Sequence, residues 1–307
     1  MSGGAYRHLG YTATSLDGFV SARAMNWWSR IFGSLTPKPA ARTAPPSLDP
    51  DIVYRESVYR DGRRQRLLPG GREVNLPPFT YNADGLATVH DASFLVDPRF
   101  REAYRRGASS GHRICPPEQL HIEWRVYLCC WAAAHAAKLP GDFVECGVST
   151  GVVSLAVCRY VEFEKLGKTF WLFDTYGGIP AEQVTDAERP LALSKNQRHY
   201  FDSYALVQEN FSAYPNVRPV RGKLPEALDG VDLGALAYLH IDMNIAYPEV
   251  EASRRLWERM TRGGVIIYDD YASPAHSEQK RALDGFAAAL GVEILSLPTG
   301  QGLLLRP

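Results

Sequence analysis

The second half of the chain alternates short apolar runs with amphipathic segments, and this alternation constrains the fold more than any other feature. Runs typical of buried strands cover 142–148, 168–174, 217–221, 236–242 and 264–270. Apolar residues recur at helical spacing in 120–139, 152–166, 200–214, 249–260 and 277–290. Strands that alternate with helices predict an α/β fold, a doubly wound and mainly parallel sheet with helices on both faces.

The last two predicted strands, 292–297 and 302–306, break this alternation. Only residues 298–301 separate them, which is too few for a parallel crossover, so they must form an antiparallel hairpin. We therefore expect a Rossmann-like, seven-stranded, mostly parallel sheet that ends in an antiparallel hairpin. This ending resembles that of class I methyltransferases and is not expected of a plain dinucleotide-binding domain.

The first third of the chain differs in composition. Residues 1–48 hold five Lys or Arg and one acid, and five prolines between 37 and 50 disfavour helices and sheet ladders. We expect a basic, Pro-rich, partly disordered tail (1–50), an irregular or helical extension (51–115) and a catalytic domain (116–307). The aromatic cluster 25–32 is interpreted as tail packing on the main domain, with a start at Met25 or a membrane-surface or partner anchor as alternatives.

Charge and cysteine usage exclude several classes of protein. The chain has 34 basic and 34 acidic residues, whereas nucleic-acid binders are usually basic. Its cysteines contain no CxxC pair and predict reduced thiols in a cytoplasmic protein: Cys115, Cys129, Cys130, Cys146 and Cys158. No run approaches the roughly 18 apolar residues of a membrane span. Residues 1–10 lack a basic start and an apolar core, which predicts no secretory signal.

Acidic residues lie at the ends of four predicted strands. They are Glu145, Asp174, Asp242 and the pair Asp269 and Asp270. Ligands of open α/β sheets bind at the carboxyl ends of the strands. Like charges gathered there repel one another unless a cation or a ligand compensates them. We therefore expect a binding site at this edge, with helix capping as the structural alternative for any single acid.

The loop after the first of these strands reads E-x-G-x-x-x-G from Glu145 to Gly151. Its glycines let the backbone approach a ligand, and the following helix start offers free N–H donors. The loop lacks the G-x-G-x-x-G fingerprint, which disfavours a nicotinamide-dependent oxidoreductase. Asp174 is placed to accept hydrogen bonds from ribose hydroxyls, and a turn or N-cap role before Gly177 is its structural alternative.

Three carboxylates on two neighbouring strand ends predict a site for a hard cation. Asp242, Asp269 and Asp270 offer the oxygen ligands that Mg²⁺ prefers. Such an ion could bind an acceptor hydroxyl and lower its pKa, and Asp242 could take the proton. A capping network without metal is the alternative. No Cys/His cluster supports zinc.

Four motifs in order carry a family resemblance: GDFVECGV (141–148), LFDT (172–175), LHIDMNIAYPE (239–249) and GGVIIYDDY (263–271). Together they resemble the macrocin O-methyltransferase family, over roughly residues 95–307, and in particular a bacterial branch of it. The resemblance implies S-adenosylmethionine as cofactor and methylation of a sugar hydroxyl, which in this family belongs to macrolide and aminocoumarin antibiotics.

The resemblance also implies roles for individual residues. Its cofactor contacts are Glu145, Gly147, Thr150, Gly151, Asp174, Thr175 and Gly222. Its Mg²⁺ ligands are Asp242, Asp269 and Asp270, and Asp242 is also its catalytic base. Asn244 stands where many members have a second aspartate, and an amide can ligate a metal but cannot act as a base.

The resulting prediction is an S-adenosylmethionine-dependent, Mg²⁺-assisted O-methyltransferase that acts on a sugar of a natural product or polysaccharide. An inactive scaffold of the same fold and a nicotinamide-dependent oxidoreductase are the alternatives. We expect a small-molecule or glycan acceptor, no nucleic acid, no membrane span and, as an open possibility, a homo-oligomer.

Five further features lie near the predicted site, and for some of them two interpretations remain open. His240 is either a base or a packed core histidine, and His276 and Tyr271 contact either the acceptor site or the surface. Residues 195–199 are interpreted as a lid over the cofactor. Cys146 is interpreted as an apolar packing residue.

Overall fold

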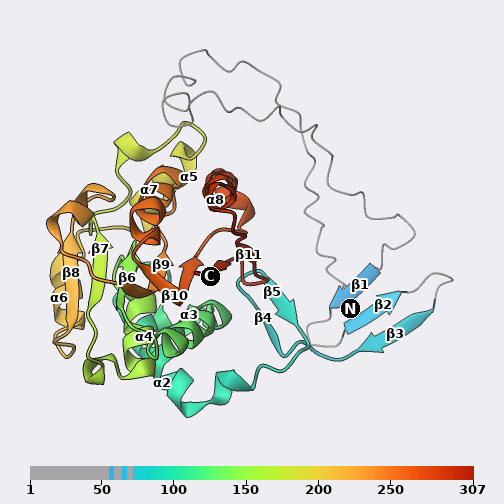
Figure 1. Ribbon diagram of the computed structural model, residues 1–307. Helices are drawn as coiled ribbons and strands as arrows, with labels where there is room; N and C mark the ends of the chain where they lie inside the picture. The colour runs from blue at the N-terminus through green and yellow to red at the C-terminus, as the bar shows by residue number, and fades with distance from the viewer. Residues whose placement is uncertain (1–54, 59–63, 68–71) are drawn as a thin grey trace. The chain divides into compact units, whose positions relative to one another are not determined.

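The computed structural model of the chain describes residues 55–58, 64–67 and 72–307 (Figure 1). The expected tail at 1–50 and the aromatic cluster at 25–32 lie outside these residues. Residues 75–307 belong to one compact unit. A separate three-stranded sheet, which lies mostly in a second unit, contains β1 (Arg55–Val58), β2 (Arg64–Leu67) and β3 (Glu73–Leu76).

The larger unit is built on a seven-stranded sheet. Its strands are β6 (Asp142–Cys146), β7 (Phe170–Asp174), β8 (Val217–Arg221), β9 (Leu236–Ile241), β10 (Met260–Tyr268), β11 (Leu295–Ser296) and β12 (Gly302–Leu305). Their order is β11-β12-β10-β9-β6-β7-β8. β12 is antiparallel to both neighbours, and the other pairings are parallel. The predicted doubly wound sheet with a terminal antiparallel hairpin is confirmed.

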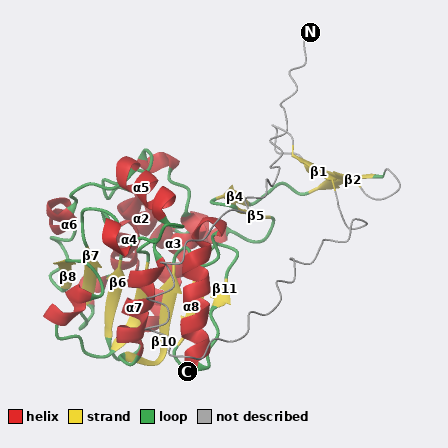
Figure 2. Cartoon of the chain, turned by 90° about the horizontal axis from the view of Figure 1, so that it is seen from above, coloured by secondary structure: helices red, strands yellow, loops and turns green. Residues whose placement is uncertain are grey.

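Helices cover both faces of this sheet (Figures 1 and 2). One face packs against α3 (Glu123–Ala136), α4 (Val152–Val161) and α6 (Tyr204–Asn210). The other packs against α7 (Ala246–Trp257) and α8 (Ser277–Leu290). The central strand β9 is buried along its whole length, as expected for a strand that helices cover on both sides.

The segment before the sheet is more regular than the expected loops and short helices. The hairpin of β4 (Tyr81–Ala83) and β5 (Leu86–Thr88) turns at Asp84 and Gly85, both with positive φ, and Asp-Gly favours such a turn. Helix α2 (Pro98–Ala108) begins after Asp97, whose carboxylate accepts the N–H of Phe100. α2 packs closely on α4, where a Cβ on Gly107 would lie 2.2 Å from the Val152 carbonyl oxygen.

One helix near the ligand-binding edge was not predicted. α5 (Arg189–Arg198) includes most of the segment that we interpreted as a lid, and it packs through Ala192 on Ile179 and Ile245. The helix expected at 200–214 is shorter and begins at Tyr204. Polar residues dominate α5, so its sequence shows no apolar stripe that could have announced it.

Candidate active site

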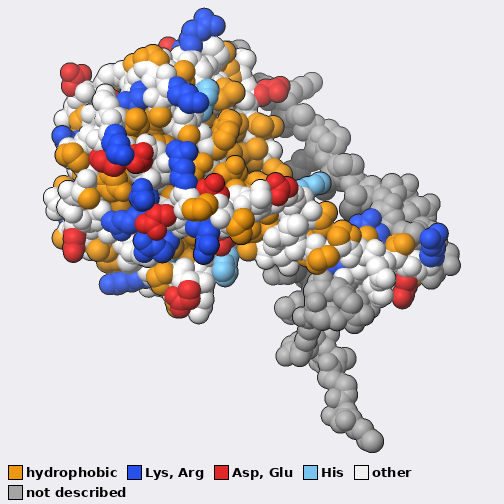
Figure 3. Space-filling model, turned by 90° about the horizontal axis from the view of Figure 1, so that it is seen from below, with side chains coloured by type: hydrophobic (Ala, Val, Ile, Leu, Met, Phe, Trp, Pro, Cys, Tyr) orange, Lys and Arg blue, Asp and Glu red, His pale blue; other side chains and the backbone are white. Residues whose placement is uncertain are grey.

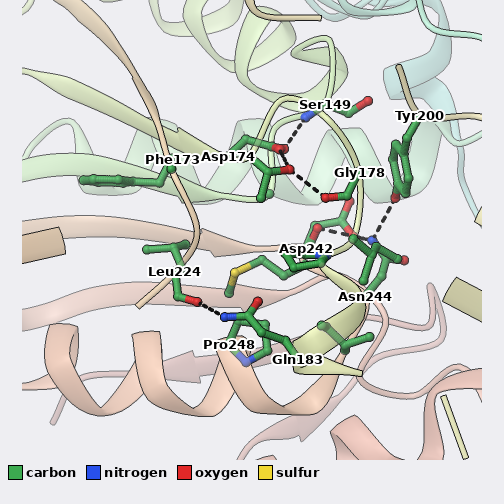
Figure 4. Close-up of a pocket in the computed structure, with 17 residues that line it drawn as sticks. Ser149, Phe173, Asp174, Gly178, Gln183, Tyr200, Leu224, Asp242, Asn244 and Pro248 are labelled. Carbon is green, nitrogen blue, oxygen red and sulfur yellow. Dashed lines mark hydrogen bonds between the residues drawn. The ribbon is translucent and has the colours of Figure 1, made fainter. Parts of the chain in front are cut away.

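A cavity lies at the carboxyl ends of β6, β7 and β9 (Figure 4). Five of the residues that we predicted as cofactor or catalytic residues line it: Gly147, Asp174, Thr175, Gly222 and Asp242. They lie at the ends of four strands, β6, β7, β8 and β9, so the topology brings them together as the strand-end pattern predicted. We call this space the first cavity.

Gly147 is held where no side chain fits. Its φ is +87°, and a Cβ there would lie 2.1 Å from the backbone oxygen of Asp242. Its N–H donates to the Phe173 carbonyl at 2.8 Å. The end of β6 is thus pressed between its two neighbouring strands, and glycine is required for that close approach.

Asp174 organises the loop that follows β6. Its Oδ2 accepts the N–H groups of Val148 at 2.6 Å and Ser149 at 2.7 Å. Its Oδ1 accepts the Tyr176 N–H at 2.6 Å and the Thr175 hydroxyl at 3.2 Å. A carboxylate offers about four acceptor positions. Asp174 therefore stabilises the turn that follows it, which is the structural alternative that we gave for this residue.

Two other predicted residues, Thr150 and Gly151, line neither of the two cavities at this edge of the sheet. Thr150 is fully buried, and its hydroxyl lies 2.8 Å from that of Ser110. Gly151 has φ +92°, and a Cβ there would meet the Phe211 ring at 2.8 Å. Their positions serve the packing of α4 and α6.

Thr175 and Gly222 line the first cavity while their own polar groups are used within the loops. The Thr175 hydroxyl donates to the Gly178 carbonyl at 2.6 Å, and the Gly222 N–H donates to the Asp174 carbonyl at 2.9 Å. Gln183 crosses the same wall and donates to the Leu224 carbonyl at 2.7 Å (Figure 4). These bonds shape the wall that continues the strand ends of β7 and β8.

A second cavity adjoins the first and shares Gly147, Ser149, Tyr200, Asp242 and Asn244 with it. It extends toward the start of α3 and residues 112–114. The predicted metal ligands Asp242, Asp269 and Asp270 line it, and one oxygen from each lies within 4.8 Å of the others. The sequence pattern therefore located this carboxylate cluster correctly.

Sequence reasoning missed the cations beside these carboxylates. Arg125 of α3 places Nη1 2.7 Å from Asp269 Oδ2 and 3.3 Å from Asp270 Oδ1, and its Nε lies 3.1 Å from Asp84 Oδ2. Lys195 of α5 lies 3.6 Å from Asp270 Oδ2. A single arginine near the start of an otherwise apolar helix was the one available signal for Arg125.

Asn244 connects the two cavities through its amide (Figure 4). Its Nδ2 donates to Asp242 Oδ1 at 2.8 Å and lies 3.3 Å from the Tyr200 hydroxyl. Its Oδ1 accepts from Lys195 Nζ. The residue has φ +65°, so the turn after β9 holds the amide against Asp242.

The environment shifts the pKa values of the acids in opposite directions. Burial raises the pKa of Asp242 well above its usual range, and Asp269 and Asp270 add to this effect. Burial alone would also raise the pKa of Asp269, but Arg125 and His240 outweigh it, and the net shift is downward. The cations thus favour the charged form of Asp269, whereas Asp242 binds a proton more readily than an exposed aspartate.

A buried carboxylate supports the turn after β9. Glu249 of α7 accepts the N–H groups of Met243 and Asn244 at 3.0 Å each, and Gln279 donates to it at 2.7 Å. Burial, with Asp270 as the next cause, raises the pKa of Glu249 to about 8. Sequence reasoning did not single out this residue.

His240 is a packed core residue, the second of its two interpretations. It is fully buried on β9 opposite Glu145 of β6, and its Nδ1 lies 3.1 Å from Glu145 Oε1. Its Nε2 lies 3.5 Å from Asp269 Oδ1. Glu145 Oε2 is buried and has no hydrogen-bond partner among the residues that the structure describes. Glu145 lines the second cavity, so a donor group of a ligand could satisfy this oxygen.

The remaining candidates separate clearly. His276 Nε2 lies 3.4 Å from Asp270 Oδ2, so this histidine does border the carboxylate cluster. The Tyr271 hydroxyl instead donates to Asp284 of α8. Cys146 is fully buried in the apolar core, and burial raises the pKa of its thiol. Its interpretation as a packing residue is confirmed.

Comparison with known proteins shows which family the chain resembles. Residues 127–294 match the family model described as Macrocin-O-methyltransferase (TylF). Mycinamicin III 3''-O-methyltransferase from Micromonospora griseorubida is 28% identical over 160 residues, which cover 48% of this chain and 62% of that protein. The 8-demethyl-8-(2,3-dimethoxy-alpha-L-rhamnosyl)-tetracenomycin-C 4'-O-methyltransferase from Streptomyces olivaceus is 28% identical over 154 residues. That match covers 48% of this chain and 59% of the relative, so the chain spans about three fifths of each curated relative.

Solved structures support the same fold. The O-methyltransferase NovP superposes with a TM-score of 0.52 at 24% identity and covers 59% of this chain and 79% of its own. The calicheamicin methyltransferase CalS11 also has a TM-score of 0.52, at 18% identity, and covers 71% and 94%. The chain therefore has the class I methyltransferase fold that the strand–helix alternation and the terminal hairpin predicted. Among the described residues, every helix is too short or too polar to cross a membrane.

Proposed function

The chain belongs to the macrocin O-methyltransferase family, and from this premise we propose that it transfers a methyl group from S-adenosylmethionine to a sugar hydroxyl. The acceptor in this proposal is a sugar of a natural product or polysaccharide. One observation carries it: the first cavity, at the ligand-binding edge of the sheet, opens beside Asp242 onto a second cavity lined by carboxylates. Cofactor and acceptor could thus meet at the half-buried carboxylate of Asp242.

The two adjoining cavities fit the cofactor at three points. Glu145 lines the second cavity, and its Oε2, which has no hydrogen-bond partner among the described residues, suits an ammonium group such as that of the methionine part. Gly147 leaves the strand end open to a ligand, and Gly222 lines the wall that we assign to the adenine. We assign the ribose to the rim at Asp174 and Thr175, where Asp174 acts chiefly by fixing the loop. When bound, S-adenosylmethionine supplies the methyl group.

Asp242 is the base of the proposed reaction. The acceptor oxygen forms a bond to the methyl carbon as the carbon–sulfur bond breaks, and the hydroxyl proton moves to an Asp242 oxygen. A raised pKa makes Asp242 a better proton acceptor than an exposed aspartate. The Asn244 amide binds Asp242 Oδ1, and we assign the proton-accepting role to Oδ2.

The carboxylate cluster fits Mg²⁺ by its chemistry. Asp242, Asp269 and Asp270 offer a set of oxygen ligands within reach of one ion, and an added cation would offset the repulsion that raises the pKa of Asp242. Arg125 Nη1 lies closer to Asp269, at 2.7 Å, than to Asp270, at 3.3 Å, so we assign the ion to the side of Asp242 and Asp270. A bound ion there would hold the acceptor hydroxyl and favour its deprotonation.

Calorimetry separates this proposal from its alternatives. The full chain titrated with S-adenosylhomocysteine should release or absorb heat, whereas NADH should give no binding signal. An inactive scaffold would bind neither ligand, and a nicotinamide-dependent oxidoreductase would bind NADH in place of S-adenosylhomocysteine. Binding of both cofactors with equal affinity would also count against the proposal.

Substitution of the base tests the mechanism. Asp242→Asn should lower methyl transfer at least about a hundredfold, because general-base catalysis contributes about 10²–10⁴-fold. Its affinity for S-adenosylhomocysteine should stay near that of the unaltered chain. Asp232→Asn, at an exposed position on the approach to β9, is the matched control. Full activity of Asp242→Asn, or undiminished activity in excess EDTA, would contradict the base or the metal assignment respectively.

The setting of the reaction completes the proposal. We propose a cytoplasmic enzyme that takes no nucleic acid as partner, and a homo-oligomer remains part of the proposal. The five cysteines are free thiols, which supports a reducing compartment. On the face drawn in Figure 3, basic and acidic side chains are interspersed. Size-exclusion chromatography with light scattering would measure the oligomeric state.

A further inference from the structure

The second cavity has a wall that the proposed methyl transfer does not use. We call it the outer wall and define it as His112, Arg113, Ile114 and His199, which all line this cavity. The first three lie between α2 and α3, and His199 follows α5 directly. The outer wall thus brings together two segments that lie far apart in the sequence, in a cavity that the carboxylates also line.

Both histidines of the outer wall contain a ring nitrogen without a partner. Within the described part of the chain, His112 Nε2 and His199 Nδ1 are buried and have no group in hydrogen-bonding geometry. His112 Nδ1 accepts the N–H of Ile114 at 3.3 Å. Burial lowers the pKa of His112 and favours the neutral ring, and a backbone hydrogen bond with Ala108 acts in the opposite direction. When Nδ1 accepts the Ile114 N–H, the proton of the neutral ring is on Nε2, which has no hydrogen-bond partner among the described residues.

Arg113 adds an unpaired charge to this wall. Its guanidinium stacks on the Phe201 ring at 3.8 Å, and no carboxylate of the described residues forms an ion pair with it. The side chain is exposed, and the stacking orients it without neutralising it. Its planar fork of donors suits phosphate and carboxylate groups.

The acids that line the same cavity do not form an ion pair with Arg113. Asp269 and Asp270 contact Arg125, and Lys195 lies beside Asp270. Glu145 contacts His240, and Asp242 accepts a hydrogen bond from Asn244. The cavity thus has a set of acids with their own contacts and an outer wall whose guanidinium has no ion-pair partner among the described residues. An acceptor with a reactive hydroxyl at one end and an anionic group at the other would match both.

We propose that the outer wall binds a negatively charged group of the methyl acceptor, a phosphate or a carboxylate, through His112, Arg113 and His199. This inference rests on the proposed function, because it assigns the second cavity to the acceptor. It narrows the acceptor class from sugars in general to sugar phosphates, including nucleotide-linked sugars, or sugar acids. A neutral glycoside would leave the two ring nitrogens and the guanidinium without partners.

The test is a calorimetric titration of the full chain saturated with S-adenosylhomocysteine. The probes are inorganic pyrophosphate, glucuronate and, as the neutral counterpart, glucose. We expect at least one anion to bind and glucose to give no signal. Arg113→Gln should weaken anion binding about tenfold, since a charge-assisted hydrogen bond is lost. Arg262→Gln, an exposed arginine in the first half of β10 rather than at the ligand-binding end, should leave binding unchanged.

Each outcome decides a point. Binding of pyrophosphate alone identifies a phosphate group, and binding of glucuronate alone identifies a carboxylate. The inference is overturned if neither anion binds more tightly than glucose, or if Arg113→Gln binds the anion as well as the unaltered chain does. Failure of S-adenosylhomocysteine itself to bind would contradict the proposed function, whereas its binding without any anion effect would contradict this inference alone.

Discussion

Replacement of Glu249 by Gln should change how the stability of the protein depends on pH. Glu249 is 2% exposed and accepts hydrogen bonds from Met243, Asn244 and Gln279. Glutamine has nearly the same shape and retains an acceptor oxygen for the two backbone N–H groups. The substitution therefore removes the ionisable group from below the Asp242–Asn244 turn while preserving most of its contacts.

The magnitude follows from the shifted pKa. Burial raises the pKa of Glu249 from an ordinary 4.5 to about 8. Between these values the folded chain still holds a proton that the unfolded chain has lost, so stability falls as the pH rises through this window. One pKa unit corresponds to about 1.4 kcal/mol, so Glu249 should cost the unaltered chain about 4 kcal/mol between pH 5 and pH 8.

Urea unfolding at pH 5 and pH 8 measures this effect. The difference in unfolding free energy between Glu249→Gln and the unaltered chain should grow by about 4 kcal/mol in favour of the variant at the higher pH. Glu258→Gln, at the exposed end of the same helix, should show a difference below about 1 kcal/mol at both values. A pH-independent difference for Glu249→Gln would refute the raised pKa and its assignment to burial.

Three further substitutions test the geometry of the site. Gly147→Ala should lose about 2–5 kcal/mol of stability and weaken S-adenosylhomocysteine binding, because a Cβ would clash with the Asp242 backbone. The control Gly167→Ala, at a position in open space, should cost little stability. Equal urea midpoints for the two variants would contradict this prediction. Arg125→Met should destabilise the fold by about 3–5 kcal/mol, because it removes the cation that contacts the carboxylates of Asp269 and Asp270. An unchanged urea midpoint would show that Arg125 does not compensate these two carboxylates. Asn244→Asp should make Mg²⁺ raise the melting temperature more than it does in the unaltered chain, since it adds a carboxylate beside Asp242; an identical Mg²⁺ effect would argue against the metal site.

The sheet could be predicted because its strands follow local rules. Apolar runs that end in an acid and are separated by helical patterns indicate that the strands are parallel. They also indicate the edge of the sheet at which the acids meet. The short gap between β11 and β12 required an antiparallel pair. The same logic brought Asp242, Asp269 and Asp270 together, because carboxyl ends of adjacent parallel strands share one edge.

Residues that act across long sequence distances could not be predicted. Arg125 lies 144 residues from Asp269, and no local pattern indicates that α3 points its guanidinium at the end of β10. α5 could not be predicted because its sequence has no apolar stripe, and the contact of Lys195 with Asn244 therefore could not be predicted either. Thr150 illustrates a different reason for a wrong assignment. It lies in the predicted ligand-binding loop, but its side chain is buried against Ser110 and does not line the site.

Transfer of a labelled methyl group tests the account most directly. The full chain would be incubated with methyl-labelled S-adenosylmethionine, Mg²⁺ and extracts of its source, and the labelled product would be identified by mass spectrometry. We predict a methyl ether on a sugar hydroxyl that forms with the unaltered chain and with Asp232→Asn but not with Asp242→Asn. Label on nitrogen or carbon, or equal labelling by Asp242→Asn, would contradict an O-methyltransferase that uses Asp242 as its base.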